Sequence, residues 1–195
     1  MPSWGIPNGE WKAVTNPSST HVARSGQSST ATPPAIGSGT EIATLDYDKV
    51  DDDEGTYLDI DAASDSYYPY LMWEWRIPLY GGARAFNKLI LSHWCWGYGY
   101  RTNKSGSLYG CKLYVWKAAT SSWELADSST TSTKDQLAHT VNTDWTTALN
   151  YVVSGTGRLH ACLIGTYSKP LGYISRIRVD QMACVFKAPD GWMLR

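Results

Sequence analysis

Four histidines and a run of carboxylates are the residues of this chain that could do acid–base or metal chemistry. The histidines are His21, His93, His139 and His160. No GxSxG, HExxH or P-loop pattern places any of them beside a nucleophile or a second ligand. His93 and His160 fall in strand-like segments, where a structural histidine is the simpler interpretation. Two distant carboxylates could still form a glycosidase pair, but we expect a protein that is not an enzyme.

The carboxylates gather in one short stretch of the chain. Asp46 and Asp48 are followed by the run Asp51-Asp52-Asp53-Glu54. Such oxygen ligands suit calcium, a hard cation, although the spacing of an EF-hand is absent. A solvated acidic turn is the alternative that needs no ion, and the sequence predicts no other cofactor.

Aromatic residues offer a second kind of chemistry, recognition by ring faces. The chain has 10 Trp and 13 Tyr against 2 Phe. Because Tyr and Trp carry a polar atom on an apolar ring, this bias favours positions where one end of the ring is buried and the other contacts water. Trp94, Trp96, Tyr98 and Tyr100 alternate along one segment, so in a strand they share a face. This stripe could stack on sugars, with hydrogen bonds from Arg101 and Asn103. It could equally pack in the core or against another subunit, because Leu89, Leu91, His93 and Cys95 make the opposite face apolar too.

Charge and segment composition exclude other partners. The formal net charge is −1, which offers no basic footprint for nucleic acid. We expect no signal peptide at Met1–Gly5 and no membrane span, hence a protein made in a cytoplasm. The four cysteines, Cys95, Cys111, Cys162 and Cys184, lack CxxC spacing, so buried free thiols are expected over a zinc site.

Residues 1–44 are predicted to form an extended N-terminal arm. Gly, Pro, Ser and Thr dominate this segment, which therefore buries too little apolar surface to offset its ordering entropy. Trp4, Ile6, Trp11 and Ile36 are nevertheless spaced along it as candidate anchors. They either fold back onto their own domain or order on a neighbouring subunit.

From Glu41 onward the hydrophobic period becomes that of strands. Leu58 and Ile60 alternate with acidic residues, and the segment 71–77 alternates more clearly still. A hairpin is predicted over 111–125 and a last strand over 173–186, with a bulge near Asp180. About eight strands with turns between them predict an all-β, antiparallel sandwich over residues 45–188, followed by a tail over 189–195.

The order of these segments resembles a known superfamily. The matching segments are Gly55–Ile60, Trp73–Pro78, Lys112–Trp116, Ser121–Glu124, Tyr151–Val152, Gly157–Leu159 and Ile177–Asp180. Together they resemble the galactose-binding-like jelly rolls, which include many carbohydrate-binding modules and domains of tailed-phage virion proteins. The resemblance implies a jelly-roll β-sandwich, and it makes Asp51, Asp53 and Asp180 candidate ligands of a structural calcium.

Two functions follow as expectations, because one fold hosts many activities. The first is a non-enzymatic virion structural protein, a phage capsid decoration or minor capsid protein or a tail component. Its partners would be other capsid subunits in a homo-oligomer, bound through the arm and the sandwich surface. The alternative is a glycan-binding module that contacts a cell-surface glycan through the Trp/Tyr stripe.

Overall fold

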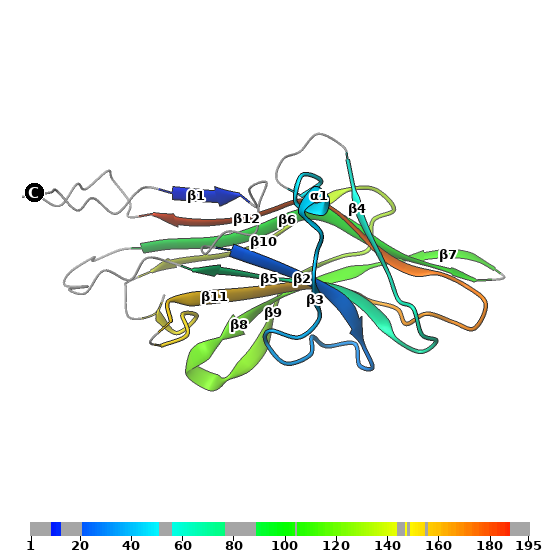
Figure 1. Ribbon diagram of the computed structural model, residues 1–195, viewed down its shortest axis with the longest axis horizontal. Helices are drawn as coiled ribbons and strands as arrows, with labels where there is room; N and C mark the ends of the chain where they lie inside the picture. The colour runs from blue at the N-terminus through cyan, green and yellow to red at the C-terminus, as the bar shows by residue number, and fades with distance from the viewer. Residues whose placement is uncertain are drawn as a thin grey trace, which may run out of the picture.

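The computed structural model describes residues 9–12, 21–50, 56–76, 89–103, 105–143, 147, 149–154 and 156–187. Two antiparallel sheets account for most of them (Figure 1). The first, sheet A, contains β1 (Gly9–Lys12), β4 (Leu58–Asp61), β6 (Leu89–Asn103), β7 (Gly106–Tyr109), β10 (Asp135–Thr143) and β12 (Ser175–Lys187). The second, sheet B, contains β2 (His21–Ser28), β3 (Thr40–Glu41), β5 (Tyr68–Arg76), β8 (Cys111–Lys117), β9 (Ser122–Ser129) and β11 (Arg158–Gly165).

The strand order confirms the jelly roll. From β4 onward, and apart from β7, which pairs with β6, sheet A runs β4–β12–β6–β10 and sheet B runs β5–β11–β8–β9. The first of these strands therefore pairs with the last, the second with the next to last, and so on inward to the β8–β9 pair. This nested pairing is that of one long antiparallel hairpin rolled into two layers, which is how a jelly roll closes its core.

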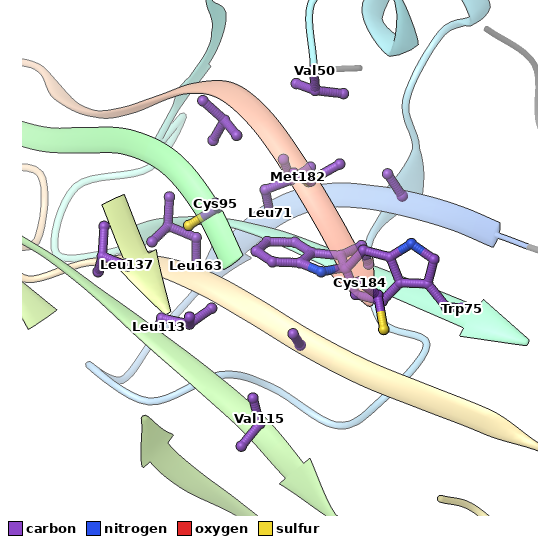
Figure 2. Packing of buried hydrophobic residues seen from close by; sticks show 14 of the residues in the cluster. Val50, Leu71, Trp75, Cys95, Leu113, Val115, Leu137, Leu163, Met182 and Cys184 are labelled. Carbon is purple, nitrogen blue, oxygen red and sulfur yellow. The ribbon is translucent and has the colours of Figure 1, made fainter. Parts of the chain in front are cut away.

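The core lies between the two sheets, where period-2 alternation sends every second side chain. On β5 the inward residues are Leu71, Trp73 and Trp75, and all three are buried. Figure 2 shows Cys95, Leu137, Met182 and Cys184 of sheet A meeting Leu71, Trp75, Leu113 and Leu163 of sheet B in this layer. The four cysteines are free and buried, as expected from their apolar surroundings.

Residues 21–44 do not form the extended arm that the composition predicts. They contain β2, β3 and the start of the short helix α1 (Thr44–Tyr47), and β2 pairs with β5 over its full length. The buried residues Ala23, Ile42 and Tyr47 join the core, and the Ala23 amide donates a hydrogen bond to Tyr47 Oη at 2.9 Å. Strand pairing and a few buried apolar residues therefore outweigh a composition that is typical of loops.

The segment 29–39, between β2 and β3, covers part of the outer face of sheet B. On this face Tyr70, Met72, Tyr114, Cys162 and Ile164 form a second apolar cluster, against which Trp123 packs. The Trp123 indole donates a hydrogen bond to the Pro34 carbonyl at 2.8 Å, which fastens the segment to β9. Ile36, a predicted anchor of the arm, lies half-buried in this segment of its own domain.

The predicted irregularity in the last strand is a β-bulge at Asp180. The register of β12 against β6 shifts between Val179 and Gln181, so Asp180 is the extra residue. Beyond it the Met182 amide donates to the Val50 carbonyl at 3.0 Å, in the gap between the residues of β12 that pair with β4 and those that pair with β1. The bulge therefore changes which residues of β12, those at even or those at odd positions, face away from the core.

Candidate binding face on sheet A

Two cross-strand rows of polar and aromatic side chains occupy the outer face of sheet A. The pairing of β4, β12, β6 and β7 fixes both rows. One row runs Asp59–Arg178–Tyr98, and the next runs Asp61–Arg176–Tyr100–Tyr109. Between these positions, Leu58, Ile60, Ile177 and Val179 point inward and are buried. The same alternation that builds the core therefore presents these seven side chains together on the opposite side.

Four tyrosine rings on this face, Tyr57, Tyr98, Tyr100 and Tyr109, form what we call the tyrosine platform. The rings of Tyr98 and Tyr100 stack at 27° with centroids 6.2 Å apart. Tyr57 meets Tyr98 edge-on at 5.9 Å, and Tyr109 continues the row at 6.4 Å from Tyr100. All four side chains are half-buried. Such contacts hold aromatic rings in preferred geometries while leaving part of each ring accessible.

Arg178 lies over the platform. Its guanidinium carbon is 5.8 Å from the Tyr57 and Tyr100 ring centroids and 5.9 Å from that of Tyr98. These are distances at which a cation is attracted to a ring face. Nη1 of Arg178 also donates a hydrogen bond to Tyr98 Oη at 3.0 Å. One side chain thus restrains three rings at once.

Both arginines are paired with aspartates. Arg176 donates to both oxygens of Asp61, at 2.5 and 2.7 Å, and to Asp59 Oδ2 at 2.7 Å. Arg178 donates from Nη2 to Asp59 Oδ2 at 3.2 Å, and its Nε lies 2.8 Å from Oδ1. The hydrogen bond to Asp61 raises the pKa of Arg176, and that to Tyr98 raises the pKa of Arg178. The bidentate geometry with Asp61 fixes the guanidinium plane of Arg176.

Trp96 extends the face along β6, on the far side of the bulge. The ammonium of Lys134 lies 5.6 Å from the Trp96 ring centroid. It also forms a 2.7 Å salt bridge with Asp180, whose side chain is only 1% exposed. The fully buried bulge carboxylate is therefore neutralised by a cation that also covers an aromatic ring.

The structure brings together only part of the predicted stripe. Trp96, Tyr98 and Tyr100 share the outer face as their spacing predicts, while Cys95 points into the core. Arg101 falls on the other side of the strand, where its guanidinium carbon lies 5.1 Å from the Tyr167 ring centroid, so the structure does not bring it together with the outer-face rings. Trp94 and Asn103 belong to β6, but their side chains lie outside the described residues.

Sequence reasoning missed the partners of the stripe. Arg176 and Arg178 take the place predicted for Arg101, and Asp59 and Asp61 complete the rows. The signal that could have found them is alternation, since both pairs of residues flank buried apolar positions at period 2. What no alternation reveals is that β4 and β6 lie on either side of β12.

The structure describes only some of the predicted arm anchors and calcium ligands. Trp4, Ile6, Asp51 and Asp53 lie outside the described residues. Trp11 is part of β1, opposite Cys184 of β12. Asp180 is engaged by Lys134, as described above. Within the described ranges, no group of three or more His, Cys, Asp or Glu residues could hold a metal ion.

A second polar cluster lies on the outer face of sheet B. Glu74 Oε1 is 3.0 Å from Arg158 Nε, and Glu74 Oε2 is 3.6 Å from Nδ1 of His160. His160 is only 4% exposed. Burial, with a smaller effect of Arg158, lowers the pKa of His160 to about 4, and burial raises that of Glu74. A neutral buried histidine beside an ion pair fits the structural role predicted for it.

No helix in the described part of the chain has the length and apolar character needed to cross a membrane.

Comparison with known proteins places the chain in a family. None of the curated proteins matches it. A family model described as "Uncharacterized protein, C-terminal domain" matches residues 19–162, which is more than half of the chain. The match begins just before β2 and ends within β11, so it includes the segment 21–44 that the structure assigns to the sandwich. The chain therefore belongs to the family described as "Uncharacterized protein, C-terminal domain".

Proposed function

We propose that the protein is a non-enzymatic glycan-binding jelly roll that holds a sugar on the tyrosine platform. The observation that carries this proposal is the stacked pair Tyr98 and Tyr100, 6.2 Å apart on the outer face of sheet A. Ring faces can pack on the apolar C–H face of a pyranose, while nearby polar groups bind its hydroxyls. Asp59 and Asp61 lie in the same rows as the two rings and offer those polar groups.

The restraint of the rings supports binding rather than core packing. Arg178 contacts three rings and donates to Tyr98 Oη, so the side chains are ordered before a ligand arrives. Ordering rotamers in advance lowers the entropic cost of binding. The core of the domain is built on the other face of the same strands and does not need these rings.

The test is binding to immobilised polysaccharides and to a glycan array. We expect Tyr98→Ala and Tyr100→Ala each to weaken binding at least tenfold, a loss of about 1.4 kcal/mol. Tyr100→Phe, which keeps the ring, should retain most of the binding affinity. Tyr67→Ala is the matched control, because this tyrosine is 37% exposed in the β4–β5 connection, outside the platform. Wild-type protein that binds no glycan would refute the proposal.

A second proposal is a virion structural role, as a phage capsid decoration or minor capsid protein or a tail component. It is supported by β1, a strand from the N-terminal segment that adds to the edge of β12 through four paired positions. A neighbouring subunit could receive this strand in the same way, with Trp4 and Trp11 as anchors. The protein would then be made in a host cytoplasm and reside in the virion as a homo-oligomer.

Truncation tests the virion proposal. The deletion must stop before His21, because β2 belongs to the sandwich. We expect the variant lacking residues 1–20 to stay folded and to lose oligomers or particle binding in light scattering and cosedimentation. An unchanged oligomer would rule out the N-terminal segment as the lock.

A further inference from the structure

We infer that the tyrosine platform selects uncharged sugars and discriminates against sialylated, uronic or sulfated ones. This inference rests on the proposed glycan binding and adds the chemical class of ligand. It follows from how the charges of this face are arranged.

The cations of the face are already paired. Three N–H groups of Arg176 donate to Asp59 and Asp61, at 2.5 to 2.7 Å. Arg178 donates from Nη1 to Tyr98 and from Nη2 to Asp59, and its Nε lies 2.8 Å from Asp59 Oδ1. An anionic sugar would approach each guanidinium beside Asp59 or Asp61, which repel it, and displacing the bidentate carboxylate of Asp61 would give it only the same kind of contact in exchange.

The charges also cancel pairwise around the rings. Asp59 and Asp61 balance Arg176 and Arg178, and Asp180 balances Lys134 beside Trp96. These pairs leave no net positive charge that would attract an anionic sugar.

Hydroxyl recognition remains available. Asp61 accepts two hydrogen bonds, both from Arg176, and its side chain is 45% exposed. A carboxylate has about four lone-pair sites, so Asp61 can also accept from a sugar hydroxyl. Tyr98 Oη accepts from Arg178, which leaves its own proton to donate. Rings, spare acceptors and one hydroxyl donor are what a neutral pyranose requires.

The experiment compares matched probes on a glycan array that carries neutral oligosaccharides beside their sialylated and sulfated forms. We expect neutral members to bind at least tenfold more tightly than their charged counterparts. We also expect binding to change less than about twofold between low and high salt, because no ion pair forms with the ligand. Preferential binding of acidic members would overturn this inference while glycan binding itself stands. Binding to neither class would instead remove the proposed function.

One variant tests the mechanism of selection directly. Asp61→Asn removes the bidentate partner of Arg176 and should raise binding to sulfated probes several-fold. Asp65→Asn is the matched control, because it makes the same charge change at a residue paired with Lys169 in the β4–β5 connection. Equal effects of the two variants would show that net charge, and not the pairing on the platform, governs selection, and would overturn the inference.

Discussion

Acid sensitivity should depend on His160, the buried histidine of β11. Its pKa is about 4 in the folded protein, against 6.5 for an unperturbed histidine. Because the folded-state pKa is lowered, the unfolded chain binds the proton more readily. The contribution of His160 to stability is therefore fully present above the unfolded pKa and is lost as the pH falls from 6.5 toward 4.

The size of this effect follows from the two pKa values. Each unit of difference corresponds to about 1.4 kcal/mol, so the full loss is about 3 kcal/mol. Roughly 2 kcal/mol of it falls between about pH 7 and about pH 5, where His160 in the unfolded chain becomes protonated. The physical cause is burial, since the imidazole is 4% exposed and a buried cation is poorly solvated.

Urea denaturation at the two pH values measures the effect. We compare the wild-type protein with His160→Gln, which keeps a polar side chain of similar size but does not titrate. The wild type should lose about 2 kcal/mol more than the variant on acidification. Glu74 and the exposed carboxylates titrate in both proteins, so their direct contribution is largely removed by the comparison. Equal losses in the two proteins would refute the role given to His160.

Three further predictions concern packing. Gly97→Ala should destabilise the fold by about 1–3 kcal/mol in urea denaturation, because its Cβ would overlap the Arg178 carbonyl oxygen; an unchanged midpoint would contradict this close approach. Trp123→Phe should cost about 1 kcal/mol and speed amide exchange in residues 29–39, through loss of the hydrogen bond to Pro34, whereas Leu125→Ala, at an exposed position, should not. The four buried thiols should resist labelling in the native protein and react after denaturation, since burial raises the pKa of each, to about 12 for Cys111; rapid native labelling would show that the core opens.

Residues 21–44 show where composition misled. The stretch from Ser25 to Thr40 is rich in Ser, Thr, Gly and Pro, and taken alone it predicts an extended arm. Its first residues form β2 because β5 offers a full row of hydrogen-bond partners. The rest of it is joined to sheet B by the hydrogen bond from Trp123, which packs against the apolar cluster there. A partner 89 residues away in the chain leaves no local signal.

The sequence by itself determined the all-β class, the burial of the cysteines, the bulge near Asp180 and the shared face of Trp96, Tyr98 and Tyr100. Each of these depends on the alternation or the apolar character of residues within single strands, which are local properties of the chain. Only the tertiary structure decided what flanks the tyrosines. Strand order and register placed Arg176, Arg178 and the two aspartates of β4 beside them. Those pairings join residues more than 70 positions apart, and their register is set by packing against the other sheet.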